Sequence, residues 1–196
     1  MNLAIRQLGA SVRMFVLLTV LLGLVYPAVV LGLGQVVAPG AAEGSLARRS
    51  GTVVGSSLIG QQLPGPQWFQ PRPSATGYGG ATSGATNLAA SDARLTKSWA
   101  DTKAALLKAN PYAVGAPPAD AYTASASGLD PHISVAYALW QVPRVARARH
   151  LSTQRVEDLV QTHTQGRTLG FLGEPRVNVL ELNLALDSLD PPGSLR

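Results

Sequence analysis

The sequence predicts an α+β domain, or an α/β domain with a small sheet, joined to one N-terminal transmembrane helix. A run of 21 residues, 14–34, contains no charged side chain. The rest of the chain is about the size of one domain. Within it, several apolar patterns have helical spacing and few stretches alternate as strands do.

The uncharged run from Met14 to Gly34 is long enough to cross a bilayer. A helix of 21 residues spans roughly 31 Å, close to the hydrocarbon thickness of about 30 Å. The run contains Tyr26 and Pro27, and we expect a kink because proline removes one backbone donor. The alternative is a cleaved signal peptide ending at the small residues 38–42. The apolar region of such a peptide is only about 7–15 residues, which favours a retained membrane helix.

The charges beside the run predict its direction. Arg6 and Arg13 precede it without an acidic residue, whereas Arg48 and Arg49 follow it at a greater distance. Basic flanking residues favour the cytoplasmic side of a membrane. The predicted parts are a cytoplasmic N-terminus (1–13), a helix in the cell membrane (14–34), a linker (35–50) and an extracytoplasmic domain (51–196).

The first part of this domain is expected to be rich in turns. β-Branched residues between glycines over 51–62 indicate one or two short strands. Four prolines between positions 64 and 73 favour irregular or extended backbone. We expect Trp68 and Phe69 to fix that segment to the core, and the small polar residues 74–87 to form a loop.

Two helices are expected in the middle of the domain. The first has Ser91 as its N-cap and ends at Asn110, which precedes a proline. The second begins at Asp130-Pro131, because a carboxylate caps a helix and a proline in the first turn loses no needed hydrogen bond. Pro143 is expected to bend or end this helix.

A third helix and a strand complete the domain. Ser152 is the expected N-cap, and apolar residues at helical spacing continue toward Gly166, with His163 on the same stripe. Residues 177–184 alternate in a way that predicts a strand. Helices with few strands give the α+β class.

Composition argues against several kinds of function. Sixteen basic and 11 acidic residues give a net charge of +5, without the dense basic stripe that is typical of nucleic-acid binding. No glycine run leads into Gly-Lys-Ser or Gly-Lys-Thr, so the sequence has no P-loop. Cysteine is absent and the three histidines are scattered, so we predict no metal site.

Ser127, Asp130 and His132 invite comparison with a nucleophile, an acid and a base. The three groups of a catalytic triad must converge, and the serine usually lies in a strained turn of the type Gly-x-Ser-x-Gly. Ser127 has no such motif around it. A membrane-anchored envelope hydrolase that uses Ser127 and His132 is therefore kept only as an alternative.

The segment SASGLDPHIS, residues 125–134, closely resembles the signature of the C subunit of the Kdp-type potassium-transporting ATPase. Other stretches resemble the same family in the same order, and together they cover nearly the whole chain. They are the N-terminal span with Tyr26-Pro27, GSSLIGQ (55–61), FQPRPSA (69–75), SGATNL (83–88), the stretch with Gln141, Arg144 and Arg147, and FLGEPRVNVLELNLALD (171–187).

The resemblance implies an accessory, non-catalytic subunit of an ATP-driven potassium uptake complex, with no cofactor of its own. Its partners would be a channel-like subunit that binds potassium and a P-type subunit that hydrolyses ATP. The family's C subunit is placed with its N-terminus inside and its domain outside. It is described as needed for assembly and as a catalytic chaperone that raises the ATP affinity of the P-type subunit. From outside, such an effect requires a coupling free energy transmitted through the complex.

Direct nucleotide binding by this chain is the other alternative. The family usually has Ser-Gly-Gly-Ser-Asn in the small-residue stretch, which has been compared to a nucleotide-sensing signature. This chain has Ser-Gly-Ala-Thr-Asn over residues 83–87, and residues 88–92 lack the family's Gly-Pro. In such a site, the backbone of this loop and an arginine such as Arg144 would together contact the phosphates. Loss of the second glycine argues against this site.

The matched positions are candidates for a surface that contacts partner subunits. A structural role in turns and caps is the alternative, and it is favoured for Gly128 and Asp130. Gln141, Arg144 and Arg147 are expected to face either a partner or water. The candidate residues are Gly84, Asn87, Ser127, Asp130, His132, Gln141, Arg144 and Arg147.

Overall fold

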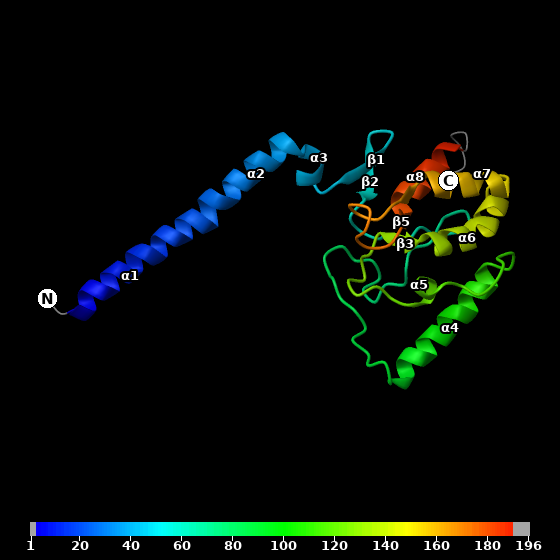
Figure 1. The fold of residues 1–196 in the computed structure, drawn as a ribbon, viewed down its shortest axis with the longest axis horizontal. Helices are drawn as coiled ribbons and strands as arrows, with labels where there is room; N and C mark the ends of the chain where they lie inside the picture. Colours follow the sequence, from blue (N-terminus) through cyan, green and yellow to red (C-terminus); the bar gives the residue numbers. More distant parts are fainter. Residues whose placement is uncertain (1–2, 190–196) are drawn as a thin grey trace. The chain divides into compact units, whose positions relative to one another are not determined.

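The computed structural model describes residues 3–189, and the chain divides into two compact units between Leu46 and Ala47. The first unit is almost entirely helical. It contains α1 (Leu3–Val20), a π-helical turn η1 (Leu21–Val25), α2 (Tyr26–Val37) and α3 (Pro39–Ala42). Figure 1 shows α1, η1 and α2 as one continuous rod.

The rod from Leu3 to Val37 is long and apolar enough to cross a membrane, and none of its residues is buried within the chain. Pro27 lies just after the π-helical turn. A proline cannot donate to the carbonyl four residues before it, and its ring crowds that carbonyl. The wider turn at η1 accommodates this local conflict without ending the helix. The predicted linker, 35–50, contains the end of α2, all of α3 and β1.

The second unit begins one residue into a hairpin, which is followed by a long segment without helices or strands. Strands β1 (Leu46–Arg49) and β2 (Thr52–Ser56) pair with each other. The two residues between them, Ser50 and Gly51, both have positive φ, as a two-residue hairpin turn requires. After the irregular residues 57–92 come α4 (Ala93–Ala109) and the short α5 (Ala119–Tyr122).

The rest of the unit combines three helices with a three-stranded antiparallel sheet of order β3-β5-β4. Val177 at the centre of β5 pairs with Ile133 of β3 and with Thr164 of β4. The elements are β3 (His132–Ser134), α6 (Val135–Ala148), α7 (Thr153–Thr162), β4 (Thr164–Gln165), β5 (Arg176–Asn178) and α8 (Val179–Leu189).

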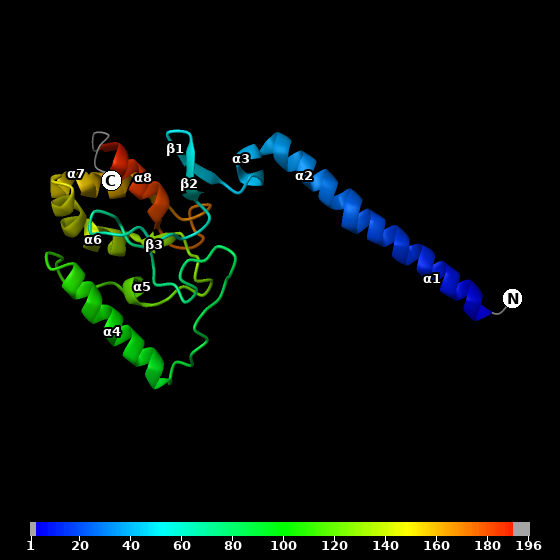
Figure 2. The ribbon, with the colours of Figure 1, turned by 180° about the vertical axis from the view of Figure 1, so that it is seen from behind.

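The hydrophobic core lies where α6, α7 and α8 meet beside this sheet (Figure 1 and Figure 2). α4 lies outside this group, buries none of its residues fully and is held mainly through α5. Trp99 of α4 meets the Tyr122 ring edge-on, and the Lys103 ammonium lies 4.3 Å from the centre of that ring. The core side chains include Phe69, Ile133, Tyr137, Val142, Val145, Val156, Val160, Val177, Leu182 and Leu186.

Two side-chain amides hold the proline-rich segment in the core. The Phe69 N–H donates to Asn183 Oδ1 (2.9 Å), and Asn183 Nδ2 donates back to the Phe69 carbonyl (2.9 Å). The Gln70 N–H donates to Gln141 Oε1 (2.7 Å), and Gln141 Nε2 donates to the Gln70 carbonyl (3.1 Å). We call these four hydrogen bonds the amide clamp. Phe69 is 0% exposed, so its backbone groups have no access to water.

Several predicted elements are confirmed. Trp68 and Phe69 are buried, α4 ends with Asn110 as its C-cap, and the Ser152 hydroxyl accepts from Arg155 N–H at the start of α7. The predicted strand region 51–62 contains β2. The overall mixture of helices with small sheets, together with one apolar N-terminal helix, also agrees with the predicted class.

Three predicted helix boundaries are wrong. The Asp92 side chain caps α4, so Ser91 is not the N-cap. The second helix does not begin at Asp130-Pro131, because Ser134 caps α6 after the strand β3. α7 ends at Thr162, before the predicted Gly166, because the chain then enters β4.

Pro143 does not end its helix, and most of the segment 177–184 is not a strand. Pro143 lies inside α6, which continues to Ala148 because its buried side chains on both sides of the proline pack into the core. Only the first residues of 177–184 are strand, and α8 begins at Val179. The Asn178 side chain accepts from the N–H groups of Leu180 and Glu181, which starts a helix where apolar alternation alone predicted a strand.

We predict that Asn183→Leu destabilises the protein by about 2–4 kcal/mol. The substitution keeps a similar volume but leaves the buried N–H and carbonyl of Phe69 without partners, each at a cost of about 1–3 kcal/mol. Urea unfolding of the full chain in detergent measures the change. Gln154→Ala is the matched control, because it removes an exposed amide that donates to Asp158 on the same helix. Equal stability of the two variants contradicts the role of the clamp.

Candidate functional site

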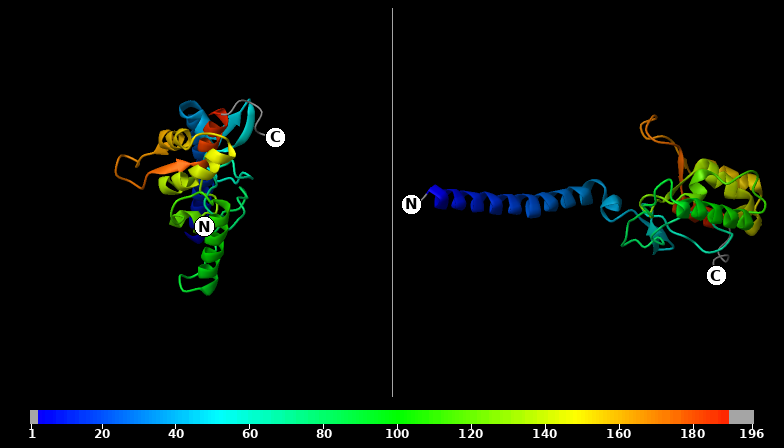
Figure 3. Two further views of the ribbon diagram at one scale, coloured as in Figure 1. Left: turned by 90° about the vertical axis from the view of Figure 1, so that its right-hand side faces the viewer. Right: turned by 90° about the horizontal axis from the view of Figure 1, so that it is seen from below.

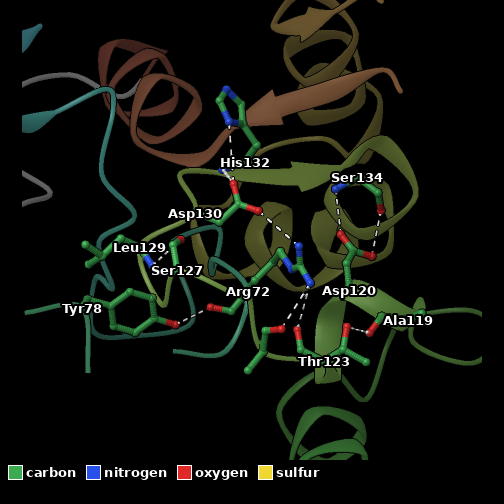
Figure 4. A network of polar contacts seen from close by, with 11 residues as sticks. Arg72, Tyr78, Ala119, Asp120, Thr123, Ser127, Leu129, Asp130, His132 and Ser134 are labelled. Carbon is green, nitrogen blue, oxygen red and sulfur yellow. Dashed lines mark hydrogen bonds and ion pairs between the residues drawn. The ribbon is translucent and has the colours of Figure 1, made fainter. Parts of the chain in front are cut away.

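The signature segment 125–134 is organised by Asp130 and Arg72 (Figure 4). One carboxylate oxygen of Asp130 accepts from the His132 N–H (2.9 Å), and the other accepts from Arg72 Nη1 (3.2 Å). Arg72 Nη2 also reaches the carbonyls of Thr123 and Ala124, both at 3.4 Å. Asp130 therefore fixes the turn before β3 and connects it to the proline-rich segment, rather than capping a helix.

A second carboxylate positions the start of α6. Asp120 of α5 accepts from the Ser134 N–H (2.7 Å) and from the Ser134 hydroxyl (2.9 Å). The same hydroxyl accepts from the Tyr137 N–H and so caps α6. α5, β3 and α6 are thus connected through one serine side chain, as Figure 4 shows for its contacts with Asp120.

Gly128 has a structural role in this turn. Its φ is +69°, and a Cβ placed there would lie 2.6 Å from Thr76 Oγ1 and 2.9 Å from the Gly84 carbonyl. Its own carbonyl accepts from the Ser74 hydroxyl (2.6 Å). The Gly84 N–H donates to the Ser127 carbonyl (2.8 Å), so the two small-residue segments lie against each other.

The remaining candidates of this region are more accessible. Ser127 and Asn87 are exposed, and Asn87 has a φ of +52°, which asparagine tolerates better than most residues. His132 is half-buried, with Nδ1 3.8 Å from Asp130 Oδ1. Burial lowers the pKa of His132 below its usual 6.5, while the nearby Asp130 charge opposes that shift.

Ser127 and His132 do not form a catalytic pair in the described part of the chain. The Ser127 hydroxyl accepts from the Leu129 N–H (3.1 Å), and no hydrogen bond within residues 3–189 joins it to His132. In Figure 4 the imidazole lies on the far side of Asp130 from Ser127. The geometry gives the hydrolase alternative no support.

An open cavity of about 450 Å³ lies beside the network. Charges of both signs line it, and the carboxylates of Asp120 and Asp130 are already hydrogen-bonded within the protein. Among residues 3–189, no group of three or more histidine or acidic side chains could hold a metal ion. The charged and polar lining residues are Arg72, Asp120, Asp130, His132, Ser134, Glu174 and Arg176.

Gln141 and Arg144 differ from the exposed positions that we expected. Gln141 is 1% exposed and belongs to the amide clamp. Arg144 is also buried and donates to Asn110, Gln141 and the carbonyls of Pro66 and Trp68. Burial lowers the pKa of Arg144 to about 10, so its guanidinium stays charged at neutral pH. These two side chains face inward because the backbone of residues 66–70 needs their hydrogen bonds.

Arg147 is the member of that group that lies at the surface. Its guanidinium stacks over the Tyr112 ring at 4.5 Å from the ring centre. The contact joins α6 to the loop after α4 and leaves Arg147 accessible.

Sequence reasoning did not find the roles of Arg72, Asn183 and Asp120. Arg72 was visible only as part of FQPRPSA, and Asp120 stands alone in a loop-like stretch. Asn183 is a polar residue among apolar ones in 177–187, which is the one signal that marks a buried hydrogen-bonding role.

One helix that is long and apolar enough to cross a membrane, followed by a domain with a buried amide clamp and an accessible polar turn, is typical of a membrane-associated protein. The sequence model of the family "K+-transporting ATPase, c chain" (KdpC) matches residues 8–188. The chain belongs to this family.

Three relatives support the assignment, each named a potassium-transporting ATPase KdpC subunit. The protein of Rhodospirillum rubrum is 51% identical over 189 residues, which cover 95% of this chain and 98% of the relative. The protein of Kineococcus radiotolerans is 51% identical, with coverage of 95% and 96%. The protein of Geobacter sulfurreducens is 49% identical over 190 residues, with coverage of 95% and 100%.

We predict that Gly128→Ala destabilises the protein by about 1–3 kcal/mol, because the added Cβ meets Thr76 and Gly84 and alanine disfavours a φ of +69°. Thermal unfolding of the full chain in detergent measures the change. Gly166→Ala is the control, since nothing lies within 4 Å of its added Cβ. A variant as stable as this control contradicts the close packing of the turn.

The lowered pKa of His132 predicts a pH dependence of stability. The unfolded chain binds the proton more readily than the folded chain, so protonation favours unfolding. The contribution is complete above about pH 7 and is lost as the pH falls through 6.5 toward the lower folded-state value. Urea unfolding at several pH values should show a steeper loss for the native chain than for His132→Gln. If the free energy of unfolding changes with pH equally steeply in both chains, the lowered pKa of His132 is contradicted.

Proposed function

We propose that the chain is an accessory subunit that assembles and stabilises an ATP-driven potassium uptake complex. The observation that carries the proposal is the family match over residues 8–188, together with relatives named as subunits of the potassium-transporting ATPase. The partners are a channel-like potassium-binding subunit and a P-type subunit that hydrolyses ATP. The chain performs no chemistry of its own, and ATP and potassium are handled by the partners.

The domain lies outside the cytoplasm in this proposal, and the N-terminal helix is its anchor in the cell membrane. The apolar rod Leu3–Val37 supports the anchor. Arg6 and Arg13 stand near its N-terminal end, and basic residues favour the cytoplasmic side. The accessible turn residues Asn87, Ser127 and His132 then face the outer side of the partner subunits.

The chain also raises the ATP affinity of the P-type subunit in this proposal, by coupling through the assembled complex. Two observations favour coupling over direct nucleotide binding. The small-residue stretch has Ala85 in place of the family's second glycine. Arg144, the arginine that we considered as its phosphate partner, already donates to Asn110, Gln141 and two backbone carbonyls.

We predict that affinity purification of the tagged full chain from gently solubilised membranes recovers both partner subunits. The purified complex should show a lower KM for ATP than the same complex prepared without this chain. Recovery of the chain alone at full yield contradicts the assembly role. An unchanged KM for ATP contradicts the coupling, and saturable labelling of this chain by a photoreactive ATP analogue favours the nucleotide-binding alternative.

A protease experiment tests the placement of the domain. Protease added to intact spheroplasts should cleave the domain, whereas a cytoplasmic marker protein should be cleaved only after permeabilisation. Protection of the domain until permeabilisation would place it in the cytoplasm and contradict the orientation.

A further inference from the structure

A hairpin projects from the three-stranded sheet between β4 and β5. Residues 166–175 connect the two strands and extend away from the helices, as both views of Figure 3 show for the orange segment. No residue of the hairpin belongs to the hydrophobic core. Packing within the domain therefore does not account for the apolar side chains at its tip.

The tip of this hairpin exposes three large apolar side chains. Leu169 is 79% exposed, Phe171 is 69% exposed and Leu172 is 48% exposed. They fall within four consecutive positions, 169–172, at the turn of the hairpin. Clustered exposed apolar side chains are typical of interaction sites, whereas single ones are common on any surface.

The hairpin holds its tip in a defined shape. Thr168 and Leu172 exchange two backbone hydrogen bonds, both of 2.9 Å. The Gly170 N–H donates to the Arg167 carbonyl (3.0 Å), and Leu169 and Gly170 both have positive φ, as in a tight hairpin turn. Arg167 and Glu174 form an ion pair of 2.8 Å across the two arms. A tip that is ordered before binding loses little conformational entropy when it binds.

Charge argues against a lipid surface as the binding partner of the tip. Peptide segments that bind anionic lipids combine apolar residues with several uncompensated lysines or arginines. Between positions 166 and 174 the only basic residue is Arg167, and it is paired with Glu174.

Area shows that the tip alone is not a complete interface with any protein, including a second copy of the chain. Stable association needs roughly 1,000 Å² or more of buried surface, which three side chains alone cannot provide. The tip therefore fits the role of an anchor inside a larger interface. The base of the hairpin continues into the candidate surface, because Glu174, Pro175 and Arg176 line the same cavity as Asp130 and His132.

We propose that Leu169, Phe171 and Leu172 form an anchor that inserts into an apolar pocket on a protein partner within the membrane complex, beside the accessible turn of Asp130 and His132. This inference rests on the proposed function, because it takes a partner subunit as the binding surface. The side chains are the apolar centre of the contact, and the charged residues at the base of the hairpin form its polar edge.

The experiment compares Phe171→Asp with Val114→Asp in the full chain, purified with its complex from solubilised membranes. Val114 is the matched control because it is 91% exposed and lies in a different loop. Phe171→Asp should increase the dissociation rate of the chain from the complex by about tenfold or more, because a buried charge replaces an anchor residue. Val114→Asp should leave the rate unchanged, and thermal unfolding should give the same midpoint for both chains in isolation.

Each outcome separates the inference from the proposed function. If the native chain recovers the complex but all three chains dissociate at equal rates, the anchor is overturned and the accessory role stands. Failure of the native chain to recover any partner overturns both. If Phe171→Asp leaves the complex intact but abolishes binding of the chain to vesicles of phosphatidylethanolamine and phosphatidylglycerol, the tip is a lipid contact and the anchor is overturned.

Discussion

The fold of the domain depends on the amide clamp at Phe69 and Gln70. Prolines at 64, 66, 71 and 73 prevent this segment from joining a regular hydrogen-bonded sheet, yet Phe69 is completely buried. Asn183 of α8 and Gln141 of α6 bond both backbone groups of these two residues, as a neighbouring strand would do. Arg144 extends the arrangement to the carbonyls of Pro66 and Trp68. The helices are therefore held together partly through a segment with no secondary structure.

The clamp and the accessible turn are connected. Arg72 follows the clamped residues by two positions, and its pairing with Asp130 holds the turn that precedes β3. Asp120 and Ser134 then set the start of α6, which carries Gln141 and Arg144 back to the clamp. A partner that binds near His132 thus contacts a surface whose shape is fixed by the core, which suits a subunit that stabilises an assembly.

Composition and spacing predicted the apolar helix, the end of α4 at Asn110, and the burial of Trp68 and Phe69. They left open whether Pro143 bends or ends its helix, and they did not predict that α8 begins at Val179. Both outcomes follow from tertiary contacts, since core packing on either side outweighs the proline and Asn178 caps a sequence that alternates like a strand. The inward position of Gln141 and Arg144 was also beyond prediction, because their acceptors lie about 70–80 residues earlier in the chain.

The amide hydrogens of Phe69 and Gln70 test the clamp most directly. Hydrogen exchange of the full chain in detergent should give both amides protection close to that of the α6 and α8 cores, because they open only when the helices separate. Fast exchange of these two amides, with α6 and α8 still protected, would contradict the view that the proline-rich segment holds the domain together.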